Sequence, residues 1–193
     1  MLNENILFKS FLLNKKELNN NIKKVKRVFE SFKTDYKNLE IPILESYEKN
    51  YRCDFSTETL KRFSKYQNII VIGMGGSILG TKSIYSFLKK KIKKKVFFFD
   101  NLDLNLHLEY KKIKNLKNSC FIVISKSGNT LETITNLNII ISTSSLKNKL
   151  VIITEGKDSS LTNIGNKLKA EIIEHKNFIG GRFSVLSEVG MFP

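Results

Sequence analysis

From residue 69 onward, short apolar runs rich in β-branched and aromatic residues alternate with longer amphipathic segments. Each run is nearly continuous in hydrophobicity, which is typical of strands that are covered on both faces. The runs occupy residues 69–72, 96–99, 121–124, 150–153 and, more weakly, 170–173. This alternation predicts parallel strands joined by right-handed crossover helices.

The segments between these runs have helical periodicity. They cover residues 77–90, 104–116, 130–142 and 159–168. We therefore expect an α/β fold, a three-layer αβα doubly wound parallel sheet of about five strands in the order 2-1-3-4-5. Because the sequence has neither an internal repeat nor a low-complexity linker, residues 68–193 are predicted to form one domain.

Residues 1–67 carry no strand signal. Apolar side chains recur there at intervals of three or four residues, which predicts an amphipathic helix. These side chains are Leu18, Ile22, Val25, Phe29 and Phe32. Pro42 marks a break, and Ser56 is placed to cap a second helix. We expect residues 1–67 to form a helical segment that packs on the domain.

The composition, with 41% hydrophobic and 26% charged residues, is ordinary for a soluble globular protein. No apolar run approaches the roughly 20 residues of a membrane span, and residues 1–13 lack the pattern of a signal peptide. Cys53 and Cys120 have no second cysteine or histidine at metal-ligand spacing, so neither a disulfide framework nor a metal site is expected. The expected location is the cytoplasm.

The formal net charge of +15 raises the question of a nucleic-acid partner. Nearly all of the positive charge comes from lysine, because the only arginines are Arg27, Arg52, Arg62 and Arg182. Nucleic-acid sites favour arginine for bidentate and stacking contacts. We therefore expect no nucleic-acid function, although a basic surface would raise the local concentration of an anionic metabolite.

A glycine-rich loop, residues 73–80, follows the first strand and leads into a helix, where backbone N–H groups can bind an anion. Gly73 and Gly75 also fit a dinucleotide fingerprint, and Asp100 is placed to receive a ribose. Ile78, however, occupies the position of the third glycine. The loop alone leaves open an anion site, a dinucleotide site and a tight turn without a ligand.

The loop after the third strand, residues 125–130, carries three hydroxyls and a lysine around one glycine. Hydroxyls and exposed amides at a helix N-terminus bind phosphate oxygens. Simple helix capping by Thr130 is the alternative. Capping explains one hydroxyl, but it does not explain Ser125, Ser127 and Lys126 together, so we favour phosphate binding.

The predicted strand order makes the first and third strands neighbours at the switch point of the sheet, where ligands bind at the carboxyl ends of the strands. The two polar loops would then face each other across one crevice. A nicotinamide site does not need a second hydroxyl-rich loop. The pair therefore favours a compact phosphorylated ligand.

Three stretches of the sequence resemble successive signature blocks of the phosphoglucose isomerase family. They are residues 72–80 (IGMGGSILG), 125–133 (SKSGNTLET) and 180–187 (GGRFSVLS). The first two blocks also resemble the wider sugar-isomerase (SIS) domain, and the third, continuing through residues 189–193, narrows the resemblance to the family. The resemblance covers residues 69–193, and its departures within the blocks, such as Met74 and Ile78, are small.

The resemblance implies roles for particular residues of this chain. The phosphate-binding residues would be Ser125, Ser127 and Thr130, helped by the backbone of Lys126. The same pocket would be lined by Gly76 and Ser77. Beside the reacting carbons would lie Gly181 and the catalytic Arg182, whose charge would stabilise an enediolate.

The implied activity is the reversible aldose–ketose isomerisation of glucose 6-phosphate and fructose 6-phosphate, in glycolysis and gluconeogenesis, by a two-domain homodimer without metal or cofactor. The base, a glutamate, and the ring-opening histidine and lysine of the family have no matching positions here. Glu188, His175 and His107 do not match them. We therefore expect an N-terminal fragment that lacks the second SIS domain, with the base beyond residue 193, and that binds but does not isomerise its ligand. A stand-alone SIS sensor of sugar phosphates and a nicotinamide-dependent enzyme remain the alternatives.

Overall fold

The structure is a computed structural model that describes residues 14–38, 40–103 and 105–193. The expectation about a signal peptide in residues 1–13 lies outside these residues. Contacts between backbone positions divide the chain into two compact units, residues 1–45 and 46–193, which are described separately below. Among the described residues, no helix is long and apolar enough to span a membrane.

The first unit contains the helix expected from the apolar spacing, α2 (Lys15–Lys37). Asn14 caps it, because the Asn14 side chain accepts a hydrogen bond from the N–H of Glu17 and the Glu17 side chain accepts one from the N–H of Asn14. A 3₁₀ helix, η1 (Pro42–Tyr47), begins at the predicted break. For residues 1–45, the expected packing on the domain stays a prediction.

Five strands in the second unit form one sheet, and all neighbouring strands are parallel. The strands are β1 (Asn68–Gly73), β2 (Lys95–Phe99), β3 (Ser119–Ile124), β4 (Leu150–Thr154) and β5 (Glu171–Glu174). Their order is β2-β1-β3-β4-β5, so the predicted fold class and strand order are confirmed. β1 and β3 lie side by side in register, with Gly73 paired to Ile124 at their carboxyl ends.

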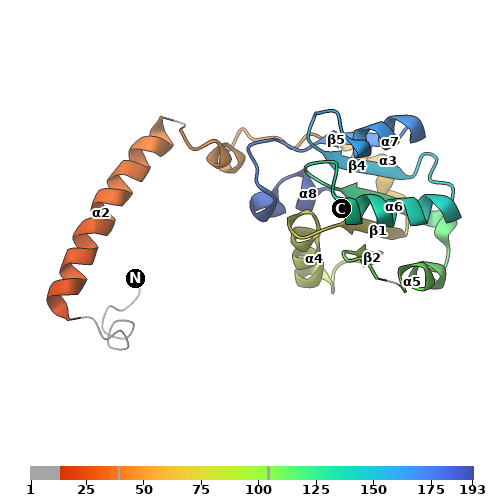
Figure 1. The fold of residues 1–193 in the computed structure, drawn as a ribbon, viewed down its shortest axis with the longest axis horizontal. Coiled ribbons are helices and arrows are strands. Elements are labelled where there is room, and N and C mark those ends of the chain that lie inside the picture. Colours follow the sequence, from red (N-terminus) through yellow and green to blue (C-terminus); the bar gives the residue numbers. More distant parts are fainter. Residues whose placement is uncertain (1–13, 39, 104) are drawn as a thin grey trace. The chain divides into compact units, whose positions relative to one another are not determined.

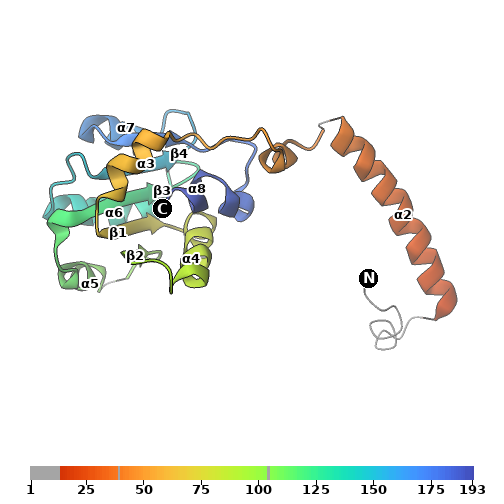
Figure 2. The same cartoon turned by 180° about the vertical axis from the view of Figure 1, so that it is seen from behind.

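Helices cover both faces of this sheet, as Figures 1 and 2 show from opposite sides. One face packs against α5 (Leu106–Lys112), α6 (Leu131–Thr143) and α7 (Ser160–Leu168). The other packs against α3 (Thr57–Ser64), α4 (Gly76–Leu88) and α8 (Glu188–Met191). Because β1, β3 and β4 are buried along their entire length, their continuous hydrophobicity in the sequence follows from this two-sided cover.

One helix is shorter than predicted. The helix expected over residues 104–116 is α5, which ends where Ile113 adopts an extended conformation and is followed by a 3₁₀ turn, η2 (Leu116–Asn118). The third signature block forms a 3₁₀ helix, η3 (Gly181–Leu186), which is followed by α8. Ser187 separates the two because its backbone is extended, and its side chain accepts a hydrogen bond from the N–H of Val189.

Candidate functional site

The turn from β1 to α4 is built on Gly75, whose φ of +52° is a conformation that favours glycine. A Cβ at Gly75 would meet no atom within 4 Å, so the outer side of this turn is open. The carbonyl of Gly75 accepts the N–H groups of Ile78 and Leu79, which starts the helix directly after the turn. Ser77, in the first turn of the helix, is half-buried.

The loop from β3 to α6 gathers the three predicted hydroxyls into one cluster. The Oγ of Ser125, which is buried, lies 2.9 Å from the Oγ1 of Thr130. The Oγ of Ser127, which is exposed, lies 3.4 Å from the same Thr130 atom. Thr130 holds the N-cap position of α6, yet its side chain accepts no hydrogen bond from that helix. Its hydroxyl therefore has a different role from the capping alternative raised by the sequence.

The tip of this loop is fixed by the neighbouring helix α7. Gly128 has a φ of +68°, and its carbonyl accepts the N–H of Leu161 at 3.0 Å. The side-chain oxygen of Asn129 accepts the N–H of Ser160 at 2.9 Å. A Cβ at Gly128 would come within 2.1 Å of the Ser159 Oγ, so no larger residue fits here without a shift. Gly128 and Asn129 thus hold the hydroxyl cluster in place.

The side chain of Lys126 turns toward the segment that follows β5. Its Nζ donates to the carbonyl of Asn177 at 2.7 Å and lies 3.4 Å from the Oε1 of Glu155. A hydrogen bond from Lys157 lowers the pKa of Glu155 most, and the Lys126 ammonium contributes in the same direction. These contacts occupy the Lys126 side chain, and the expected contribution of its backbone to phosphate binding stays a prediction.

The third block packs its glycines against the first. A Cβ on Gly76 would come within 2.3 Å of the carbonyl oxygen of Gly181, so the two backbones are in direct contact. The Ser184 hydroxyl lies 2.7 Å from the Gly181 carbonyl oxygen and 3.2 Å from that of Gly76, and its proton can be donated to either. Arg182 follows directly and is exposed.

The three blocks therefore meet at the carboxyl ends of β1 and β3. The first and third are joined by the Gly76–Gly181 contact, and the first and second by the strand pairing of Gly73 with Ile124. The hydrogen bond from Lys126 connects the second block to Asn177, three residues before the third. Arg182 makes no hydrogen bond or ion pair with any residue in the described ranges. Its guanidinium is available to an anionic ligand at this edge of the sheet.

A buried polar network that sequence analysis missed supports the third block. Glu188 is fully buried, its Oε1 accepts hydrogen bonds from the Tyr51 hydroxyl and the Asp54 N–H, and its Oε2 faces His175. The sequence analysis gave Glu188 no role, and the structure shows that its carboxylate is buried and faces His175. These residues are far apart in the chain and belong to no motif, so no sequence pattern could have identified the network.

Asp100, the acidic residue that a dinucleotide site would require, is already paired with another side chain. The carboxylate of Asp100, which follows β2, forms an ion pair with the ammonium of Lys82 from α4. Ile78, at the position where a dinucleotide fingerprint has its third glycine, is fully buried in the core. In the part of the chain that the structure describes, no group of three His, Cys, Asp or Glu side chains could hold a metal ion.

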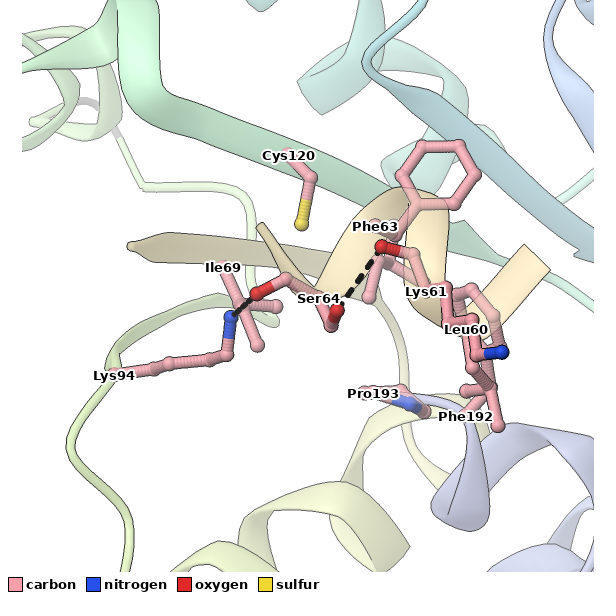
Figure 3. A pocket seen from close by; sticks show the side chains of 10 residues that line it. Leu60, Lys61, Phe63, Ser64, Ile69, Lys94, Cys120, Phe192 and Pro193 are labelled. Carbon is pink, nitrogen blue, oxygen red and sulfur yellow. Dashed lines mark hydrogen bonds between the residues drawn. The ribbon is translucent and has the colours of Figure 1, made fainter. Parts of the chain in front are cut away.

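An apolar cavity of about 280 Å³ lies elsewhere in the domain, between α3 and the sheet (Figure 3). Its lining includes Ile69 and Cys120, the second residues of β1 and β3, and therefore lies toward the amino ends of these strands. Beside it, the Lys94 ammonium donates to the carbonyl of Ser64. The cavity is apolar and far along the strands from the hydroxyl cluster, so it is not part of the candidate site.

Comparison with known proteins gives one consistent result. The sequence profile of the family described as phosphoglucose isomerase matches residues 44–193. The chain is 39% identical over 144 residues to a glucose-6-phosphate isomerase of Methanocaldococcus jannaschii, covering 72% of this chain and 35% of the relative. It is 40% identical over 177 residues to that of Borreliella burgdorferi, covering 77% and 33%.

Among solved structures, a glucose-6-phosphate isomerase of Chlamydia trachomatis matches with a TM-score of 0.60 and 30% identity, covering 69% of this chain and 27% of that one. The chain thus spans about a third of the length of the curated relatives that it matches.

Proposed function

Since this chain belongs to the phosphoglucose isomerase family, we propose that it binds a hexose 6-phosphate and supplies the sugar-phosphate-binding part of a glucose-6-phosphate isomerase. The proposed reaction is the interconversion of glucose 6-phosphate and fructose 6-phosphate in glycolysis and gluconeogenesis. The observation that carries the proposal is the meeting of the three blocks at one edge of the sheet. The second block contributes a hydroxyl cluster at a helix N-terminus, and the third contributes an arginine that has no partner among the described residues.

The phosphate is assigned to the hydroxyl cluster of Ser125, Ser127 and Thr130. Thr130 begins α6 without capping it, so a phosphate can approach the N-terminus of this helix, where the helix dipole favours negative charge. The turn is open at Gly75, the residue directly before Gly76 and Ser77. A ligand bound there would be a compact anion, which supports a sugar phosphate over a dinucleotide.

The reacting end of the sugar is assigned to Gly181 and Arg182. During isomerisation a proton moves between carbons one and two, and negative charge develops on the oxygens of an enediolate. A guanidinium has a fixed positive charge and can stabilise that oxyanion without reorganising. Gly181 keeps the backbone close to the β1–α4 turn, so that the arginine side chain starts from the edge of the proposed pocket.

The general base is proposed to come from outside these 193 residues. Glu188 is buried beneath the third block and is held by Tyr51, Asp54 and His175, so it does not face the pocket. Glu155 is paired with Lys157 and Lys126. The 193 residues alone would then bind the sugar phosphate without isomerising it, because proton transfer needs a positioned base.

The proposed setting is the cytoplasm, with a homodimer as the active form and without a metal or cofactor. Both cysteines are free thiols, and Cys120 is buried in the core, which agrees with a reducing compartment. An isomerisation of this type moves protons within one substrate and needs no redox cofactor.

The deciding experiment is a coupled assay that converts fructose 6-phosphate to glucose 6-phosphate, run on the 193-residue chain and on the longest product of its reading frame. Activity in the longer product alone would support an isomerase whose base lies outside these residues. Activity in neither, with tight binding of a sugar phosphate, would favour a sugar-phosphate sensor built on the same fold. Activity in the 193-residue chain would contradict the proposed origin of the base.

A further inference from the structure

A buried imidazole and a buried carboxylate face each other beneath the turn that carries Arg182. His175, directly after β5, is 1% exposed, and Glu188, at the start of α8, is 0% exposed. The Nδ1 of His175 lies 3.5 Å from the Oε2 of Glu188. This distance is long for a hydrogen bond but suits an ion pair, and burial of an ionised group in such a place is costly unless a partner neutralises it.

The other ring nitrogen of His175, Nε2, must carry a proton. The Nε2 of His175 lies 3.1 Å from the carbonyl oxygen of Ile179. A carbonyl oxygen can only accept a hydrogen bond, so Nε2 must donate and carries a proton. Ile179 stands two residues before Gly181, which makes this hydrogen bond an anchor of the turn that leads to Arg182.

The surroundings of Glu188 favour its ionised form. Burial raises the pKa of Glu188, but the facing imidazole of His175 and the hydrogen bonds from its own backbone, Tyr51 and Asp54 outweigh burial and leave the pKa below its usual value. Since the carboxylate is ionised, a neutral imidazole protonated at Nε2 would aim the Nδ1 lone pair at a negative oxygen. A proton on Nδ1 removes this repulsion and neutralises the buried charge.

No other cation takes this place within the described residues. The titratable groups nearest Glu188 are the Tyr51 phenol, the Cys53 thiol and the Asp54 carboxyl, which are neutral or negative. The Asp54 carboxylate accepts the N–H of Glu174, and the Lys176 ammonium is directed to the Glu174 carboxylate. Among the described residues, His175 is therefore the one cationic partner available to Glu188.

We propose that His175 is a positioning residue for Arg182, held as a doubly protonated imidazolium between the Ile179 carbonyl and the Glu188 carboxylate. The turn between β5 and η3 is then fixed by two separate contacts, this clamp and the hydrogen bond from Lys126 to Asn177. The clamp acts on the sugar end of the site and leaves the hydroxyl cluster untouched. The role assigned to the clamp rests on the proposed function, in which Arg182 contacts the sugar.

The protonation state can be tested without any ligand. The chain has only two histidines, so a His107→Gln variant leaves His175 as the sole imidazole signal in long-range ¹H–¹⁵N correlation spectra. At pH 7 we expect both ring nitrogens of His175 to have the chemical shifts of protonated nitrogen. One nitrogen with the shift of an unprotonated imidazole would overturn the clamp, whatever the chain binds.

The positioning role is tested by comparing two ligands, fructose 6-phosphate and inorganic phosphate, in calorimetric titrations of the 193-residue chain. His175→Gln should raise the dissociation constant of fructose 6-phosphate at least about tenfold, because a charged hydrogen bond is lost from the turn. The affinity for inorganic phosphate should stay the same, because the hydroxyl cluster is not anchored by His175. Equal weakening of both ligands, or of neither, would overturn the positioning role.

Two further variants keep the test decisive. His175→Leu combined with Glu188→Gln removes both buried charges. The amide oxygen at position 188 can still accept hydrogen bonds from Tyr51 and Asp54, so this double variant should fold. It should show the same loss of affinity for fructose 6-phosphate and no loss for inorganic phosphate. Tyr110→Phe, which removes a hydrogen bond to Ser144 on the other face of the sheet, is the control and should change neither affinity. A wild-type chain that binds neither ligand would contradict the proposed function, while the spectra would still decide the clamp.

Discussion

Gly76 and Gly181 are in direct backbone contact, which joins the turn after β1 to the turn that carries Arg182. A Cβ on Gly76 would lie 2.3 Å from the Gly181 carbonyl oxygen and 2.4 Å from its carbonyl carbon. A Cβ on Gly181 would meet only the Gly76 Cα, at an ordinary 3.8 Å. The contact is therefore asymmetric: only Gly76 must be a glycine for the two turns to approach this closely.

The first prediction follows from this asymmetry. Gly76→Ala should force η3 away from α4 and lower the free energy of unfolding by about 1–3 kcal/mol, as overpacking does. It should also weaken the binding of fructose 6-phosphate. Gly181→Ala should lower the free energy of unfolding much less, because its added methyl group has room. Chemical denaturation and ligand titration of both variants measure the difference. Equal stability losses in the two variants would contradict the packing seen here.

The second prediction concerns the hydroxyl cluster. Ser127→Ala combined with Thr130→Ala removes two hydroxyls proposed to bind the phosphate, so the dissociation constant for fructose 6-phosphate should rise at least about tenfold. The dissociation constant for inorganic phosphate should rise as well. Ser142→Ala, which removes an exposed hydroxyl at the other end of α6, is the matched control. An unchanged dissociation constant in the double variant would refute the assignment of the phosphate.

The strands were predictable from the sequence because two-sided burial leaves a continuous apolar run. Thus β3 and β4, which are fully buried, were found within two residues of their bounds. Helix ends were less predictable, since they depend on single backbone conformations such as that of Ile113, which ends α5. The packing of η3 and α8 on α4 depends on contacts such as that of Gly80 with Val185, which no local pattern encodes.

For the candidate site, the sequence predicted which loops carry polar groups and the structure adds how they are held. Short motifs predicted Ser125, Ser127 and Thr130 as neighbours, because a tight loop after a strand brings them together. The second use of the loop, in which Asn129 accepts a hydrogen bond from α7, requires a helix that lies about thirty residues later. The clamp of His175 and Glu188 is equally long-range, because it depends on how α8 packs against the segment that follows β5.

The third prediction tests how the loop is held. Asn129→Ala removes the acceptor of the Ser160 N–H at the start of α7, so it should lower the free energy of unfolding by about 1 kcal/mol, as the loss of a helix cap does. Asn129→Asp keeps an oxygen at the same place and should retain most of the stability. Thermal unfolding of the two variants compares them directly. A loss as large for the aspartate as for the alanine would show that the hydrogen bond is not what Asn129 contributes.

The fourth prediction concerns stability at alkaline pH. Burial raises the pKa of Cys120 to about 11, with Lys94 and a backbone hydrogen bond acting in the opposite direction, and burial and the charge of Glu188 raise the pKa of Cys53 to about 11. The pKa of Tyr51 is also raised, first by burial and then by Glu188. Each group is protonated in both folded and unfolded chains at neutral pH. Above about pH 9 the unfolded chain releases its thiol protons first, so stability falls as the pH rises from about 9 toward 11.

Cys120→Ala isolates one part of this effect. At pH 7 the variant should be less stable than the wild type, because the cavity lined by Cys120 becomes larger. Between about pH 9 and 11 the wild type should lose stability on the order of 2–3 kcal/mol through this thiol, which the variant cannot lose. The two stability curves from urea unfolding should therefore converge as the pH rises. Parallel curves would mean that the Cys120 thiolate is tolerated in the folded chain and that burial does not hold the thiol in its protonated form.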